Sequence, residues 1–379
     1  MSKVCISGTN IISSLGFTTH QNLLQIEQGN IGIKQVDDKR ITPEPLPVSL
    51  VPEEPLLQRA GELSTYGPLT RFEKFLLLSV IDALTQTSLD ASSEDTLFII
   101  STTKGNVELL SADHPVSFER ERVYLWKSAQ IVQQYFGNPN TPLVISNACI
   151  SGVAGLVNGM RLIQSGRYKN VVVVGADVIS RFIVSGFQSF KSLDDVPCRP
   201  FDANRQGLTI GEGAGTIILT SQEDLKTYDA LLVKGSISND ANHISGPSRT
   251  GEGLYVAIKN TLPPEASIDF ISAHGTGTPY NDDMESKALK RTGLDRVPVN
   301  SYKGYFGHTL GAAGLIETVL SLESMKQNVL HKTANYKESG TAEKINIVAS
   351  QQYKQINQIL KIASGFGGCN AALYIKKQP

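Results

Sequence analysis

Cys149 is the residue of this chain whose surroundings best suit a nucleophile. It lies in the run Ser146-Asn-Ala-Cys-Ile-Ser-Gly152, between a short apolar segment and a stretch rich in Gly, Ala and Val. A cysteine at such a strand-to-helix turn has its thiolate favoured by the free N–H groups and the dipole of the helix start. The thiolate could attack a thioester. A cysteine that serves only as a small buried hydrophobic residue has the same appearance.

Two of the six histidines occur in glycine-rich segments. His274 begins a His-Gly-Thr-Gly-Thr-Pro run directly after an apolar segment, and His308 follows a Tyr-Lys-Gly-Tyr-Phe-Gly run that also delivers Lys303. Because Gly and Pro exclude a helix interior after His274, we expect its imidazole on a tight loop at the end of a strand. Open α/β sheets place their sites there. A single histidine would more often be a packed core residue.

A third glycine-rich segment, Ser364-Gly-Phe-Gly-Gly-Cys-Asn370, leads into the last predicted strand. Glycines allow positive φ and close approach of the backbone, so N–H groups can point into a cavity. The segment is a poor dinucleotide fingerprint, because no helix and acidic residue follow it. We expect Gly365, Phe366 and Gly367 to contact substrate.

Apolar runs predict the elements that position these residues. Near-continuous hydrophobicity is typical of strands covered on both faces. The predicted strands begin at Leu97, Leu143, Val171, Gly215, Leu231, Phe270 and Ala371. The predicted helices run from Phe72 to Thr85, from Gly152 to Gln164, from Asp283 to Arg291 and from Ala312 to Lys326. Strand and helix alternate, so we predict the α/β class.

The two halves of the chain resemble each other loosely. Leu143 to Gln164 and Val297 to Leu322 each run from a short strand through a turn into a small-residue helix. A duplication would explain this, and so would the ordinary likeness of any two βα units. The polar segment from Ser221 to Tyr228 would then separate halves 1–221 and 222–379.

Composition excludes several classes of function. The chain has 379 residues, 40% of them hydrophobic, and a formal net charge of -1, which gives no indication of nucleic acid or membrane binding. The first residues lack the features of a secretory signal, so we expect a cytoplasmic protein. The scattered cysteines form no CxxC pair and no zinc-like cluster, so no metal site is predicted.

With the segment from Cys198-Arg-Pro-Phe-Asp to Gly-Glu-Gly-Ala-Gly215, these motifs resemble the β-ketoacyl synthases of the thiolase superfamily, in the family's order. The resemblance implies a thiolase-like fold with two pseudo-duplicated halves and a five-layered αβαβα core. It also implies a nucleophilic role for Cys149 and a gating role for Phe366. His274 and His308 would be the two active-site histidines.

The resemblance further implies supporting residues and partners. Lys303 and Glu285 would pair near the site, with either a catalytic or a structural role. Thr276 and Thr278 would contact the phosphopantetheine arm of an acyl carrier protein. Such an enzyme uses no metal or redox cofactor, because its substrates arrive as carrier-bound thioesters, and it is usually a homodimer.

The implied reaction is a decarboxylative Claisen condensation. A carrier-bound acyl group passes to Cys149 while the N–H groups of Cys149 and Phe366 hold the oxyanion. A malonyl thioester then loses carbon dioxide, and its enolate oxygen sits between Nε2 of His274 and Nε2 of His308. The carbanion attacks the acyl group to give a β-ketoacyl product. Fatty-acid, polyketide and polyene pathways all fit.

Two other interpretations stay open. One is a thiolase-like enzyme that condenses or cleaves coenzyme A thioesters. Cys369, which stands where the synthases usually have threonine, invites this comparison, but the second cysteine of a thiolase would align nearer Phe366. The other is the active or regulatory subunit of a ketosynthase and chain-length-factor heterodimer, although regulatory subunits usually lack the cysteine. For carrier docking, Arg120, Arg122 and Lys127 are candidates, but charged residues of this kind more often belong to an ordinary solvated face.

Overall fold

A computed structural model describes residues 2–378 except 62, 64–66 and 112–117. Its centre is a ten-stranded sheet with the order β11-β10-β14-β15-β9-β1-β8-β6-β4-β5. These strands are β1 (Cys5–Ile12), β4 (Thr96–Ser101), β5 (Leu143–Ile145), β6 (Asn170–Asp177), β8 (Gly213–Thr220), β9 (Tyr228–Asn239), β10 (Phe270–Ser272), β11 (Val299–Asn300), β14 (Gln358–Gly365) and β15 (Cys369–Lys377). Two small sheets add β2 (Lys34–Val36), β3 (Leu46–Ser49) and β7 (Ile210–Gly211), and β12 (Val329–Leu330) with β13 (Gln352–Tyr353).

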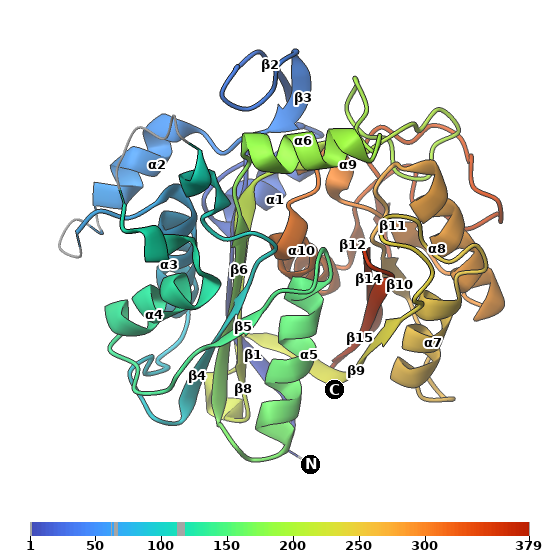
Figure 1. The fold of residues 1–379 in the computed structure, drawn as a ribbon. Helices are drawn as coiled ribbons and strands as arrows, with labels where there is room; N and C mark the ends of the chain where they lie inside the picture. The colour runs from blue at the N-terminus through green and yellow to red at the C-terminus, as the bar shows by residue number, and fades with distance from the viewer. Residues whose placement is uncertain (1, 62, 64–66, 112–117, 379) are drawn as a thin grey trace.

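The helices form layers on either side of and between the two halves of this sheet (Figure 1). They are α1 (Thr19–Glu27), α2 (Glu53–Ala60), α3 (Arg71–Leu84), α4 (Leu125–Tyr135), α5 (Ser151–Gln164), α6 (Arg181–Ser189), α7 (Glu252–Thr261), α8 (Pro279–Arg291), α9 (Lys303–Phe306) and α10 (Ala313–Gln327). In Figure 1, α3 and α4 lie outside one half, α7 and α8 lie outside the other, and α5 and α10 fill the middle. The α/β class and the five layers expected from the sequence are both present.

The two halves of the sheet repeat one topology. Each half of the sheet has five strands, which can be numbered 1 to 5 in chain order. From the outer edge inward, their order is 3-2-4-5-1 in both halves: β5, β4, β6, β8, β1 in one and β11, β10, β14, β15, β9 in the other. The outer three strands run parallel, and the fifth is antiparallel to both its neighbours. This repeat favours duplication over a chance likeness of βα units. The boundaries 1–221 and 222–379 stay a prediction.

The contact between α5 and α10 brings two helix starts together. A Cβ on Gly152 would lie 2.9 Å from the Gly311 oxygen, and one on Gly314 would lie 2.9 Å from the Val153 nitrogen. Only glycine allows this approach. Every residue of α10 except its last two is buried, because both half-sheets cover it. The segments just before these helices, which carry Cys149 and His308, are therefore held close together.

The sequence patterns locate most of the longer elements at the centre of the fold. All seven predicted strands and all four predicted helices overlap observed ones. The patterns do not predict β14, whose apolar run is interrupted by Lys361, or the shorter helices α4, α6 and α7. A lone lysine in an apolar run lowers the strand signal, although tertiary contacts bury it fully here. Among the described residues, no helix combines the length and apolar character needed to cross a membrane.

Candidate active site

Cys149 lies on a strained turn between β5 and α5. Ala148 has a φ of 44°, a left-handed conformation that a residue with a Cβ adopts only when its surroundings enforce it. Ser151 enforces it, because its hydroxyl donates to the Ala148 oxygen at 2.6 Å and accepts from the Asn147 nitrogen at 2.9 Å. The turn places Cys149, which is 7% exposed, at the start of α5.

His274 lies on the loop between β10 and α8, as the sequence predicts. The Glu285 carboxylate accepts hydrogen bonds from the backbone nitrogens of His274 and Gly275, both at 2.7 Å. Gly275 has a φ of 43°, and a Cβ there would lie 2.5 Å from the Ser301 Cβ. Asp282 accepts from the Thr276 nitrogen at 3.0 Å. Two carboxylates of α8 thus hold the loop by its backbone.

The second histidine, His308, is placed between α9 and the 3₁₀ helix η5 (Leu310–Ala312). Its nitrogen donates to the Thr209 oxygen at 2.7 Å, and the Leu310 nitrogen donates to its Nδ1 at 3.2 Å. Because Nδ1 accepts, the neutral imidazole carries its proton on Nε2. This Nε2 is buried and has no hydrogen-bond partner among the described residues. It is therefore a donor that a ligand in the pocket can use.

Lys303 sets the tautomer of His274. Its Nζ lies 3.3 Å from His274 Nδ1, and an ammonium has donors only, so Nδ1 accepts and Nε2 carries the proton. The ion pair differs from the sequence expectation. Lys303 pairs with Glu317 of α10 at 2.5 Å, whereas both Glu285 oxygens already accept backbone N–H groups. The pairing of Lys303 with Glu285 is therefore wrong in detail, although both residues adjoin His274.

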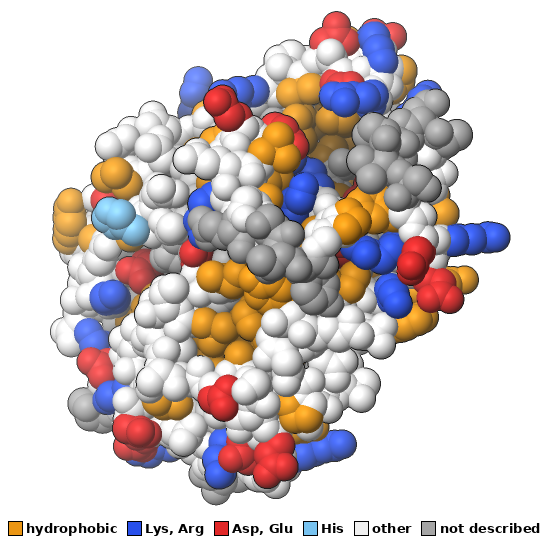
Figure 2. All heavy atoms as spheres, turned by 90° about the vertical axis from the view of Figure 1, so that its left-hand side faces the viewer, with side chains coloured by type: hydrophobic (Ala, Val, Ile, Leu, Met, Phe, Trp, Pro, Cys, Tyr) orange, Lys and Arg blue, Asp and Glu red, His pale blue; other side chains and the backbone are white. Residues whose placement is uncertain are grey.

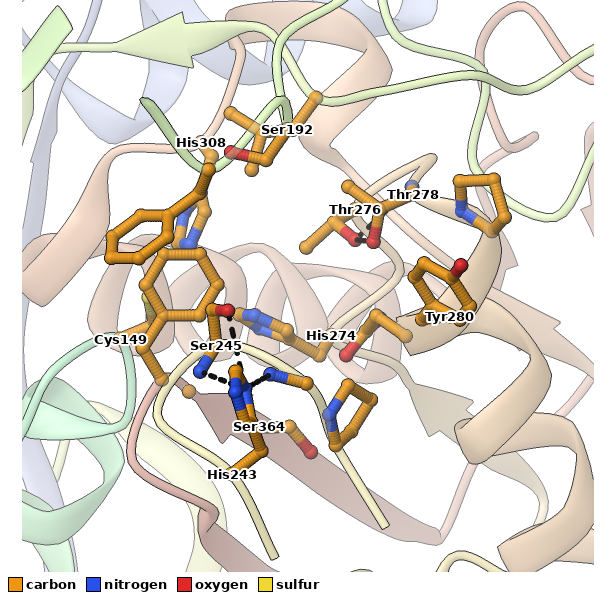
Figure 3. A pocket seen from close by; sticks show the side chains of 18 of the residues that line it. Cys149, Ser192, His243, Ser245, His274, Thr276, Thr278, Tyr280, His308 and Ser364 are labelled. Carbon is orange, nitrogen blue, oxygen red and sulfur yellow. Dashed lines mark hydrogen bonds between the residues drawn. The ribbon is translucent and has the colours of Figure 1, made fainter. Parts of the chain in front are cut away.

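The three chemically active side chains converge. The Cys149 sulfur and one ring nitrogen of each histidine all lie within 4.8 Å of one another. The His274 and His308 ring centroids are 5.0 Å apart, with the rings 83° to each other. Figure 3 shows the three side chains around one end of the pocket, with Thr276 and Thr278 farther along its wall.

Burial controls the charge of these groups. It lowers the pKa values of His274 and His308 well below their usual value, and the Lys303 ammonium lowers both further, so both imidazoles are neutral. Burial also raises the pKa of the Cys149 thiol to about 12, with Cys369 adding to the rise, while Lys303 and the Phe366 N–H act against it. Burial thus opposes the thiolate that the helix start was expected to favour.

One thiol and two imidazoles are a donor set that zinc accepts. The tautomers argue against a metal, because a ring nitrogen that carries a proton has no lone pair for a ligand bond. Both Nε2 atoms carry that proton, and both Nδ1 atoms are engaged by N–H donors. The site therefore suits hydrogen bonding to an oxygen better than it suits metal binding.

The pocket above these groups has a volume of about 410 Å³. Thr276 and Thr278 line it, and their hydroxyls lie 2.9 Å apart. Tyr280, which is 79% exposed, marks the mouth. The two threonines thus lie where an extended arm that reached from the mouth to Cys149 would pass.

Phe366 lines the pocket together with Cys149. A Cβ on Gly365 would lie 3.0 Å from the Cys149 nitrogen, so the loop that carries Phe366 passes close to the backbone of Cys149. The Phe366 ring contacts Phe187 and Phe190, with centroids 5.4 and 5.2 Å away. The sequence patterns give no indication of these two aromatic residues, because the run around them carries no other chemical signal. Gly367 has a φ of 82° and donates to the Ile244 oxygen.

Two further buried charged residues are not among the sequence-based candidates. Glu317 lies within the apolar run of α10, and Lys361 lies within that of β14. A lone charged residue in a fully apolar run must find a partner in the core, and that is a signal the sequence does carry. Cys369 donates weakly to the Phe366 oxygen at 3.4 Å and lies beside the Phe366 loop.

Two family models match this chain. Residues 69–225 match the model of the β-ketoacyl synthase N-terminal domain, and residues 230–337 match that of the β-ketoacyl synthase C-terminal domain. Between them the two models cover most of the chain.

Individual relatives extend the match. The 3-oxoacyl-[acyl-carrier-protein] synthase 2 of Rhizobium meliloti (strain 1021) is 35% identical over 63% of this chain and 61% of its own length, which is less than two thirds. The protein of the same name from Vibrio harveyi is 27% identical over 99% of this chain and 98% of its own. A solved structure described as the ishigamide ketosynthase/chain length factor superposes with a TM-score of 0.88 at 24% identity, over the full length of both chains.

Proposed function

We propose that this chain, which belongs to the β-ketoacyl synthase family, catalyses the decarboxylative condensation of an acyl group held on Cys149 with a malonyl thioester. One observation carries the proposal: two neutral imidazoles, each with its proton on Nε2, have a ring nitrogen within 4.8 Å of the Cys149 sulfur. Two such donors suit a developing enolate oxygen, and burial makes each hydrogen bond stronger than in water.

In the first half-reaction, the Cys149 sulfur attacks the carbonyl of an acyl thioester. The Phe366 N–H, which already faces the sulfur, is one donor to the oxyanion, and the Cys149 N–H is the second. The carbon–sulfur bond to the pantetheine breaks, and the thiol proton of Cys149 ends on the departing sulfur. Neither imidazole has a free lone pair to accept that proton while Lys303 and the Leu310 nitrogen engage Nδ1.

In the second half-reaction, a malonyl thioester places its carbonyl oxygen between the two Nε2 atoms. The bond to the carboxylate breaks, carbon dioxide leaves, and the electron pair forms an enolate held by the two N–H groups. Its carbon then attacks the acyl carbonyl and displaces Cys149. Each step is completed without a metal or a redox group, so we propose that none is used. Dialysis against a chelator is expected to leave the rate unchanged.

An acyl carrier protein is the proposed donor of both thioesters. Thr276 and Thr278 would contact the phosphopantetheine arm along the pocket wall. Lys191 at the mouth is exposed, and it suits an acidic carrier better than the candidates from the sequence. Arg122 in particular is only 15% exposed, because it pairs with Glu73. The cytoplasm remains the proposed location, since Cys149 must stay reduced.

A dimer is proposed on the face that carries α4. Hydrophobic side chains gather in a hollow on this face (Figure 2). Tyr124 and Trp126, at the start of α4, are stacked on each other and are 54% and 53% exposed. The edge strand β5 leads directly to Cys149 and exposes Leu143. The partner is a second copy or a related subunit, and sedimentation of the chain alone distinguishes the two.

Intact mass measurement tests the proposal. Incubation with an acyl-carrier protein thioester is expected to add one acyl group to the wild type and none to Cys149→Ala. Cys149→Gln should lose condensation but keep malonyl decarboxylation, because the histidines remain. An unchanged adduct in Cys149→Ala would remove Cys149 from its role. If malonyl thioesters are ignored and acetoacetyl-coenzyme A is cleaved, the thiolase interpretation is correct instead.

A further inference from the structure

Beneath the two histidines lies a buried cluster of charge that the proposed reaction does not use directly. Lys361 is fully buried on β14, and its Nζ donates to Glu317 at 2.5 Å. Lys303 takes the other oxygen of the same carboxylate. One carboxylate therefore serves two ammonium groups, so these three side chains together carry a net positive charge in the core.

Both ammonium groups also hold the backbone that leads to His274. Lys361 donates to the Ala273 oxygen at 3.1 Å and to the Ser272 oxygen at 3.3 Å. Lys303 donates to the oxygen of His274 itself. The two lysines thus donate hydrogen bonds to three successive backbone oxygens, those of Ser272, Ala273 and His274. These bonds fix the backbone from which the His274 imidazole extends.

We propose that Lys361 is a positioning residue for His274: it holds Glu317 and the end of β10 so that Lys303 stays on Nδ1, and its charge acts on both imidazoles together with that of Lys303. The inference rests on the proposed function, because its consequence is a constant supply of two Nε2 donors. An imidazolium would carry a proton on Nδ1, opposite the Lys303 ammonium or the Leu310 N–H, and the ring would have to turn away.

The charges around His274 support this role. Lys303 of α9 lies on its ring, Glu285 of α8 accepts from its backbone nitrogen, and Cys149 and the ring of His308 lie beside it. Glu317 of α10 contacts both lysines, and Lys361 of β14 holds the Ala273 oxygen just before it. Lys361 acts in the same direction on both rings and helps to lower the pKa values of His274 and His308. Burial in turn lowers the pKa of Lys361, which the Glu317 carboxylate opposes. Removing Lys361 would leave Lys303 and Glu317 as a neutral pair.

The test compares three variants of the full-length enzyme. In Lys361→Met the cluster loses its net positive charge, so the histidines should become protonated at higher pH. In a plot of the malonyl decarboxylation rate against pH, the fall on the acid side (the acid limb) is expected to move to higher pH by about one unit. Lys361→Met/Glu317→Gln removes one charge of each sign, which restores the net charge, and its limb should return toward that of the wild type. Lys376→Met, at an exposed position of β15, is the matched control and should not shift the limb.

A second measurement does not depend on activity. The imidazole ¹⁵N shifts of His274 and His308 report protonation directly, and in Lys361→Met they are expected to titrate about one pH unit higher than in the wild type. Unchanged titration, with a rate lowered equally at every pH, would make Lys361 purely structural and overturn the inference. If the double variant titrates like Lys361→Met, the charge argument also fails. A wild type that decarboxylates nothing would instead count against the proposed function.

Discussion

At the scale of single residues, the site is a set of fixed donors. Leu310 and Lys303 engage Nδ1 of the two imidazoles, so the Nε2 protons need no rearrangement before they meet an oxygen. Preorganisation of this kind is often the largest contribution to catalysis. The thiol has a different environment, because burial raises its pKa to about 12 and so favours the protonated form.

His308→Ala separates the two half-reactions. Its Nε2 has no protein partner among the described residues, so the imidazole is expected to serve the malonyl unit and not the thiol. The variant should lose malonyl decarboxylation by about 10²–10³-fold, the typical cost of one oxyanion donor, while acylation of Cys149 changes much less. The measurements are carbon dioxide release and intact mass. Equal losses in both steps would show that His308 also serves the nucleophile.

At the scale of elements, the close contact of α5 and α10 positions the site. The turn before α5 presents Cys149, the turn before α10 presents His308, and glycines at the crossing let the helices meet. The His274 loop is held by different elements, since its carboxylate partners come from α8 and its lysine partners from α9 and β14.

Gly152→Ala tests the helix contact. The new Cβ would meet the Gly311 oxygen and the Leu315 nitrogen at 2.9 and 3.0 Å, and backbone atoms there cannot move aside cheaply. The free energy of unfolding should fall by about 1–3 kcal/mol. Gly186→Ala in α6 is the control, because nothing lies within 4 Å of the methyl group that it would add, and it should gain about 0.5–1 kcal/mol. Denaturant titration of both variants measures the difference.

At the scale of the whole molecule, the proposed function requires the pocket mouth to receive a carrier protein. Lys191 lies at the mouth, where an acidic carrier would approach. Lys191→Glu should raise KM for malonyl-carrier protein by about tenfold through slower association, and leave malonyl-pantetheine unaffected. Lys39→Glu serves as a control at a surface position outside the pocket lining. Equal effects on both substrates would place Lys191 in the pocket chemistry and not in docking.

The stability of the whole fold should depend on pH through a histidine outside the site. Burial lowers the pKa of His331 from 6.5 to about 4, so its stabilising contribution is present above pH 6.5 and is lost as pH falls toward 4. The loss over that window is about 3 kcal/mol. His331→Gln should remove this part of the pH dependence, whereas His20→Gln, at an exposed position, should not. The free energy of unfolding of the wild type and of both variants, measured between pH 7 and pH 4, tests this prediction.

The sequence by itself indicated which side chains are candidates for the chemistry and which elements present them. The four candidates each lie in a short run rich in small residues, and such a run can be recognised from the sequence alone: they are Cys149, His274, His308 and Phe366. Strand and helix alternation likewise indicated the α/β class, because burial on both faces imposes a continuous apolar pattern.

Tertiary structure alone decided how those groups are partnered. Lys303 pairs with Glu317 and not with Glu285, Lys361 joins them from β14, and the tautomers follow from these contacts. Each partner lies on a different element, so no spacing in the sequence could rank them. Which charged side chains pair depends on their distance and burial in the folded chain, and these are set by the packing of the two half-sheets against α5 and α10.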